Sequence, residues 1–116
     1  MTQQLKSFLS GKWVSGEGQG AALHNPTTEE VVAYTSTQGL DLGSALAFAR
    51  DRGGSGLREL SFAQRGEMLA KMASAIHDFR DELLDLATLN GGNTRSDAKF
   101  DVDGATFTLS WYAKLG

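Results

Sequence analysis

Apolar residues recur at steps of three and four in the second half of the chain. They are Met68, Leu69, Met72, Ile76, Phe79, Leu83, Leu86 and Leu89. This spacing draws one apolar stripe along a helix. Ser61 and Gln64 have the form of a capping box, which marks a helix start. Asp78 is placed to cap a second segment after a break near His77, and residues 90–93 (Asn-Gly-Gly-Asn) indicate the end.

Two further helices are expected, one before and one after this segment of the sequence. Asp41 is a good N-cap for the first of them, and the pair Gly53 and Gly54 is expected to end it. Ser96 is expected to cap the last helix, whose apolar positions are Phe100, Phe107, Trp111 and Leu115. Gly104 weakens the middle of this helix by about 1 kcal/mol relative to alanine.

The first third of the chain has a different pattern, with short apolar stretches between turn residues. Gly16, Gly18 and Gly20 indicate a turn, and Pro26 indicates a bend. Residues 31–37 are β-branched and aromatic and predict a strand. We therefore predict an α/β fold in which β segments, including a hairpin, occupy residues 1–38 and three to four helices occupy residues 41–116.

Length and composition narrow the class of protein. The 116 residues make one domain or a piece of one. The ratio of 14 glycines to one proline counts against a complete, self-sufficient domain, so the chain could be a piece of a longer protein. The net charge of −3 argues against a nucleic-acid module. No apolar run reaches the ~18 residues that span a bilayer, and the first residues do not resemble a signal peptide. A soluble cytoplasmic protein without nucleic-acid or membrane partners is the expectation.

The chain offers little catalytic chemistry of its own. With no cysteine, it has no thiolate nucleophile and no thiolate metal site. The glycines near residue 18 do not precede a helix, so a plain turn is favoured over a phosphate loop. Asp97, Asp101 and Asp103 could give oxygens to a hard cation, but a solvated acidic helix face is the favoured interpretation. No catalytic and no cofactor-binding residues are predicted.

The order of several short motifs resembles the opening of the aldehyde dehydrogenase superfamily. Residues 10–14 read Ser-Gly-Lys-Trp-Val, similar to the family's "x-G-x-W". Residues 25–31 read Asn-Pro-Thr-Thr-Glu-Glu-Val, similar to its "N-P-x-T-G-E-x-[IV]", with Glu29 where the family usually has glycine. Residues 65–69 and 81–92 resemble its "R-x-x-x-L" and "E-L-A-x-L-x-x-x-x-G-K" helices.

The final residues narrow the resemblance to one branch. Residues 101–113 look like the family's "E-V … R-Y-Y-A" helix. Together with residues 38–41 and 57–65, the ending at 101–116 looks like one particular branch of the family. The branch oxidises CoA-linked semialdehydes in bacterial phenylacetate and benzoate degradation, and some members are fused to a MaoC-type hydratase. The resemblance implies that this chain is the N-terminal portion of a nucleotide-binding domain, residues 1–116. The parent would use NAD or NADP, which this chain alone is not expected to bind.

The resemblance also implies roles for particular residues. Many members bind a structural cation near the Asn-Pro turn, so the backbone carbonyls of Leu23 and His24 and the carboxylate of Asp101 are the expected ligands. The alignment leaves Asp103 as an alternative to Asp101. The last helix lies near the substrate entrance in relatives, which makes Phe107 and Trp111 candidates for lining it.

Two roles remain open for the chain itself. In the first, it is a catalytically inactive portion of such a dehydrogenase, and its partner is the remainder of the enzyme. In the second, it is a stand-alone helical interaction or oligomerisation protein that self-associates through an orphaned apolar face. A small independent nucleotide-binding protein is disfavoured because no phosphate loop is present.

Overall fold

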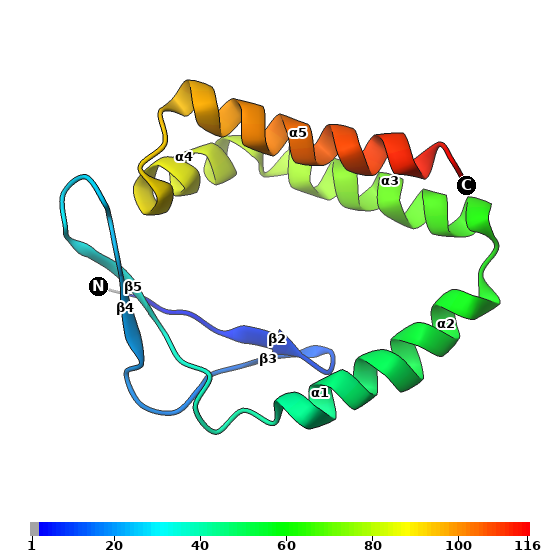
Figure 1. The fold of residues 1–116 in the computed structure, drawn as a ribbon, viewed down its shortest axis with the longest axis horizontal. Coiled ribbons are helices and arrows are strands. Elements are labelled where there is room, and N and C mark those ends of the chain that lie inside the picture. Colours follow the sequence, from blue (N-terminus) through cyan, green and yellow to red (C-terminus); the bar gives the residue numbers. More distant parts are fainter. Residues whose placement is uncertain (1–2) are drawn as a thin grey trace. The chain divides into compact units, whose positions relative to one another are not determined.

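The computed structural model describes residues 3–116 (Figure 1). The chain divides into two compact units, Met1–Ser55 and Gly56–Gly116, and each is described by itself. Among the described residues, every strand lies before residue 36 and every helix begins after residue 41, as the sequence predicts.

The first unit contains a three-stranded sheet in the order β1-β5-β4. Its strands are β1 (Gln3–Gln4), β4 (Ala21–His24) and β5 (Val31–Thr35). β4 and β5 are antiparallel, with a register irregularity between Leu23 and His24, and β1 runs parallel to β5. Most of the β-branched and aromatic run at 31–37 therefore forms the central strand, which carries Ala33, the one buried residue among the described residues 3–55.

A separate hairpin joins β2 (Ser7–Leu9) to β3 (Lys12–Val14). Ser10 and Gly11 form its two-residue turn with φ of 51° and 82°, the positive values that tight hairpin turns require. Phe8 and Trp13 face each other across the strands with ring centroids 5.1 Å apart. Both rings are largely exposed.

Helical backbone runs through residues 42–59, which corrects one sequence prediction. The segment comprises α1 (Leu42–Phe48), a π-helical turn η1 (Ala49–Gly53) and α2 (Gly54–Glu59). The Asp41 carboxylate accepts a hydrogen bond from the Ser44 backbone and caps α1, as predicted. Gly53 and Gly54 do not end the helix. Gly54 has a right-handed φ of −62°, and the backbone just before it, Ala49–Gly53, is a wider π-helical turn.

Three helices form the second unit: α3 (Phe62–Asp78), α4 (Arg80–Gly91) and α5 (Arg95–Ala113). The predicted capping box is confirmed, with Ser61 and Gln64 bonding each other's backbone at 3.1 and 2.9 Å. The predicted break near His77 is also confirmed. It falls at Phe79, whose side chain makes no cap, so Asp78 is not the cap that the sequence suggested. Likewise Thr94, not Ser96, caps the last helix.

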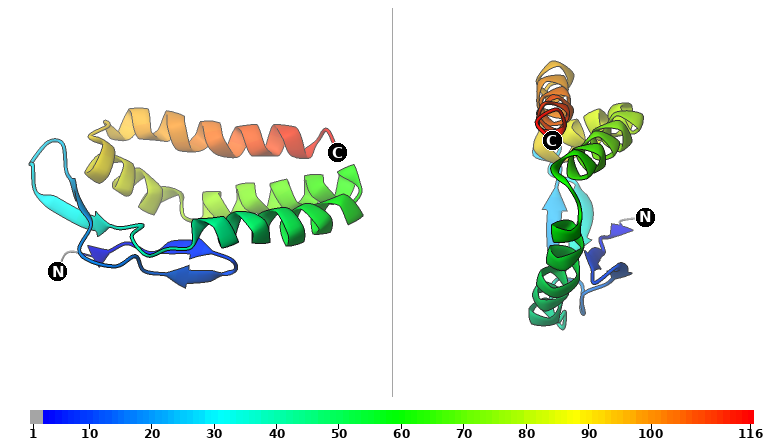
Figure 2. Two further views of the ribbon diagram at one scale, coloured as in Figure 1. Left: turned by 60° about the horizontal axis from the view of Figure 1, so that its bottom comes forward. Right: turned by 90° about the vertical axis from the view of Figure 1, so that its right-hand side faces the viewer.

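Helices α3 and α5 lie side by side, and small residues form much of their contact (Figures 1 and 2). Gly66 is buried there, and an added Cβ would come within 2.5 Å of the Ala113 carbonyl oxygen. Ala73 and Ala98 are buried, as is Leu84 of α4, the one large side chain with no exposure among the described residues. Small side chains let two backbones approach closely, which explains how helices with so few large buried residues form a layer.

The predicted apolar stripe divides into a covered and an uncovered part. Leu69, Ile76 and Leu83 are half-buried within the second unit. The exposed members are Met68, Met72, Phe79, Leu86 and Leu89. Within residues 3–116, no helix is long and apolar enough to cross a membrane.

Candidate functional site

A pair of parallel hydrogen bonds joins the start of α4 to α5. The Arg80 guanidinium donates two hydrogen bonds to the Asp103 carboxylate, from Nε to Oδ1 at 2.7 Å and from Nη2 to Oδ2 at 2.8 Å. These bonds hold the pKa of Asp103 below its ordinary value and raise the pKa of Arg80. Two parallel bonds fix geometry as well as charge, so this pair sets how α4 meets α5.

The other two candidate aspartates are also engaged. Asp97 accepts a hydrogen bond from the Thr94 hydroxyl at 2.7 Å at the start of α5. Asp101 accepts one from the Asn93 amide at 3.2 Å. In residues 3–116, no group of three or more His, Cys, Asp or Glu side chains is placed to hold a metal ion. The three aspartates on α5 thus each make a side-chain contact within the second unit, and whether any of them also binds a cation stays a prediction.

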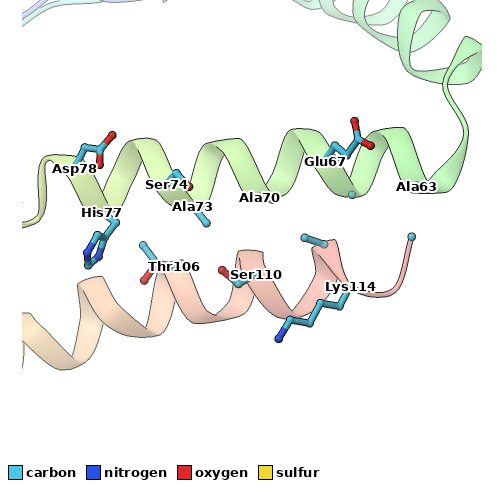
Figure 3. Close-up of a pocket in the computed structure, with 13 residues that line it drawn as sticks. Ala63, Glu67, Ala70, Ala73, Ser74, His77, Asp78, Thr106, Ser110 and Lys114 are labelled. Atoms are coloured by element: carbon cyan, nitrogen blue, oxygen red, sulfur yellow. The ribbon is translucent and has the colours of Figure 1, made fainter.

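An open groove of about 740 Å³ lies between α3 and α5 (Figure 3). Its floor is made of small residues, Ala70 and Ala73 among them, and its polar side chains include His77 of α3 and Ser110 of α5. The Thr106 hydroxyl, which also lines the groove, donates to the carbonyl of Asp103 at 3.1 Å. The groove follows from the small residues at the helix contact, and the Thr106 hydroxyl in it bonds the backbone of its own helix.

The predicted cation ligands fall in different units. Leu23 and His24 lie at the irregular register of β4, and Asp101 lies on α5. The His24 ring donates from Nδ1 to the Glu29 carbonyl oxygen at 3.0 Å, which ties β4 to the turn before β5. A cation shared by these residues, or by Asp103 in place of Asp101, stays a prediction.

Phe107 and Trp111, the predicted entrance residues, are exposed on α5. Trp111 makes an edge-to-face contact with Tyr112, with ring centroids 4.9 Å apart. Phe100, which the sequence places on the same helix, is more exposed than either. Steps of seven and four put all three residues on one helix face. The Arg80–Asp103 pair gives no such signal, because its members are 23 residues apart.

A sequence model of the aldehyde dehydrogenase family matches residues 13–116. The 3,4-dehydroadipyl-CoA semialdehyde dehydrogenase of Aromatoleum evansii is 42% identical over 97% of this chain and 22% of its own length. The betaine aldehyde dehydrogenase of Bacillus subtilis is 34% identical over 99% of the chain and 24% of its own length.

The fold is also found in solved structures. The NAD-dependent benzaldehyde dehydrogenase of Corynebacterium glutamicum superposes with a TM-score of 0.83 at 21% identity, over 95% of this chain and 24% of that one. The chain thus spans less than a quarter of the length of these relatives. The matched segment covers the strands from Trp13 onward and all of the helices, and the chain belongs to the aldehyde dehydrogenase family.

Proposed function

We propose that this chain is the N-terminal part of an NAD(P)-dependent dehydrogenase that oxidises a CoA-linked semialdehyde to the acid. The enzyme acts in the degradation of aromatic compounds in the cytoplasm. The observation that carries the proposal is the 42% identity, over 97% of this chain, with an enzyme named for such a substrate. A betaine aldehyde dehydrogenase and an aldehyde dehydrogenase named for no particular substrate are less similar, at 34% and 30%.

In this proposal the chain contributes structure, and the catalytic residues lie elsewhere in the enzyme. The chain contains no cysteine that could attack an aldehyde. The carboxylates of its acidic face are held by Arg80, Thr94 and Asn93. NAD or NADP, when bound by the whole enzyme, supplies the hydride acceptor. The work of this chain is to hold α3, α4 and α5 as one layer, through the Arg80–Asp103 pair and the close contact at Gly66.

The test is the mass and activity of the native gene product. We expect a product several times heavier than 12.4 kDa that reduces NAD or NADP with a CoA-linked semialdehyde. Betaine aldehyde, which has no CoA group, is the control substrate and should react far more slowly. A heavier product that prefers betaine aldehyde would contradict the substrate class while leaving the dehydrogenase assignment intact.

The alternative is a stand-alone interaction protein derived from such an enzyme. The observation in its favour is the number of large apolar side chains that remain exposed on α3, α4 and α5. It predicts a native product of 12.4 kDa that forms one defined symmetric assembly. The same mass measurement therefore separates the two roles.

A further inference from the structure

Helix α4 ends in an asparagine that is followed by two glycines. Asn90 and Gly91 are the last two residues of the helix, and both are exposed. Gly92, the C-cap, has a left-handed φ of 71° and donates its N–H to the Thr88 carbonyl oxygen at 3.1 Å. A short link then leads into α5 (Figure 1). The final turn of a helix frays more readily than its middle, so Asn90 and Gly91 lie where the backbone of α4 opens first.

We propose that Asn90 is a site of spontaneous deamidation through the backbone nitrogen of Gly91. When the last turn opens, this nitrogen attacks the amide carbon of the Asn90 side chain. The new C–N bond closes a succinimide ring, and the side-chain nitrogen leaves as ammonia with the proton that the Gly91 nitrogen loses. Water then adds to either carbonyl of the ring and breaks one C–N bond, which leaves aspartate or isoaspartate. Water is the one other reactant.

Glycine at position 91 makes the ring closure easy, and the helix controls when it happens. Gly91 has no Cβ to obstruct the attack and adopts the backbone angles that the ring requires at little cost. In helical backbone the peptide N–H points along the helix axis toward the preceding turn, away from the side chain that it would attack. The rate therefore depends on the fraction of time for which the last turn of α4 is open.

The chain has two other asparagines, and both are less suited to this reaction. Asn25 precedes Pro26, whose ring nitrogen carries no hydrogen and cannot close the succinimide. Asn93 precedes the β-branched Thr94, which crowds the attacking nitrogen. The Asn93 amide also donates a hydrogen bond to the Asp101 carboxylate at 3.2 Å. The asparagine of α4 is therefore expected to be the most reactive of the three.

The reaction would change the end of α4 and its connection to α5. Helix α4 has no basic residue in its last turn that could offset a new negative charge. Either product places a carboxylate at the negative end of the helix dipole, which disfavours the last turn. Isoaspartate also adds a methylene group to the main chain, just before the link that holds Asn93 against Asp101. Deamidation therefore loosens the joint between α4 and α5 without the action of another enzyme.

Peptide mass spectrometry of the full-length gene product tests the proposal. Trypsin cleavage after Arg80 and Arg95 places Asn90 and Asn93 in one peptide, residues 81–95, so each is measured against the other. Deamidation raises the peptide mass by the difference between water and ammonia, and fragment ions locate the change. We expect conversion at Asn90 to be at least roughly tenfold faster than at Asn93. It should be faster at mildly alkaline than at neutral pH, because the attacking nitrogen must lose its proton.

Three variants identify the groups involved. Asn90→Gln should remove the conversion at this position, because glutamine closes the corresponding larger ring far more slowly. Gly91→Ala should slow it at least roughly tenfold, since alanine obstructs the attack and favours the helix. The added Cβ would lie 2.5 Å from the Asn93 side-chain oxygen, so Asn93→Gln is the matched control for a disturbed Asn93 and should leave conversion at Asn90 intact.

A synthetic peptide of residues 81–95 supplies the reference rate without the fold. Conversion at Asn90 in the folded product, slower than in the peptide and faster than at Asn93, supports the proposal. Conversion at Asn93 in place of Asn90 overturns it. An unchanged folded product after the peptide has converted fully also overturns it, because the last turn of α4 then does not open enough. None of these outcomes depends on whether the enzyme oxidises a semialdehyde, so they are distinct from the test of the proposed function.

Discussion

Glu29 occupies a backbone conformation that costs free energy for any residue with a side chain. Its φ is +64°, in the left-handed region, and its backbone N–H donates to the Asn25 carbonyl to close the turn before β5. Most family members, by the resemblance of this motif, have glycine at the equivalent position. Since left-handed backbone costs an L-residue about 1–2 kcal/mol, the departure from the motif has a structural cost at one residue.

We therefore expect Glu29→Gly to stabilise the turn. Part of the gain is offset by the greater flexibility of glycine in the unfolded chain, so the net increase in the free energy of unfolding is about 0.5–1 kcal/mol. Thermal unfolding followed by circular dichroism measures it. Glu30→Gly is the matched control, because Glu30 has no positive φ. A gain from Glu30→Gly as large as that from Glu29→Gly would contradict the backbone explanation.

Two helical glycines give opposite predictions for the same substitution. At Gly66 of α3, a Cβ would lie 2.5 Å from the Ala113 carbonyl oxygen, so Gly66→Ala forces α3 and α5 apart. At Gly104 of α5, nothing lies within 4 Å. We expect Gly66→Ala to lower the free energy of unfolding by about 1–3 kcal/mol. Gly104→Ala should raise it by about 1 kcal/mol, from helix propensity alone. Chemical denaturation of both variants checks the pair, and a loss of stability in both would show that close contact at Gly66 is not the cause.

At the scale of helices, the Arg80–Asp103 pair predicts a pH dependence. Hydrogen bonds from Arg80 depress the pKa of Asp103 in the folded chain. A depressed pKa stabilises the fold above the unfolded pKa, here taken as 3.8, and the stabilisation is lost as the pH falls through the lower folded value. Asp103→Asn should therefore lower the melting temperature at pH 6, and the difference should vanish at strongly acid pH. Glu67→Gln, a carboxylate on exposed α3 surface, is the control and should show a smaller difference at pH 6.

The helix boundaries show which elements the sequence specifies locally. Capping is a contact between near neighbours, so Ser61 with Gln64 and the cap at Asp41 could be predicted and are confirmed. The sequence alone favours Ser96 over Thr94 as the cap of α5, because both residue types are good caps; the hydrogen bond that the Asp97 backbone N–H donates to the Thr94 hydroxyl shows that Thr94 is the cap. The helical path through Gly53 cannot be predicted from the sequence, because glycine permits a helix to end without requiring it.

At the scale of the whole molecule, periodicity identifies apolar faces but not what covers them. The spacing of Met72, Ile76 and Phe79 predicts one stripe, and only the structure separates half-buried Ile76 from exposed Met72 and Phe79. The fold class could be predicted because each element carries its own pattern. The candidate cation ligands could not be tested in the same way, since Leu23 and Asp101 belong to different units.

The small core predicts that the isolated chain is close to its stability limit. Leu84 of α4 is fully buried, whereas the other fully covered positions of the helical unit are alanine and glycine. Replacing a buried leucine with alanine costs about 2–5 kcal/mol. The whole stability of a native domain is only about 5–15 kcal/mol, and a unit that leaves large apolar faces uncovered belongs at or below the lower end of that range. We therefore expect Leu84→Ala to abolish cooperative unfolding of the helical unit in the 116-residue chain, measured by circular dichroism.

Leu86→Ala, two residues later and 56% exposed, should leave the transition within about 1 kcal/mol of the parent chain. In the full-length product the order can change, because Leu86 lies on the exposed part of the apolar stripe and would gain a covering surface there. A large loss from Leu86→Ala in the isolated chain would show instead that the chain already covers this face by self-association.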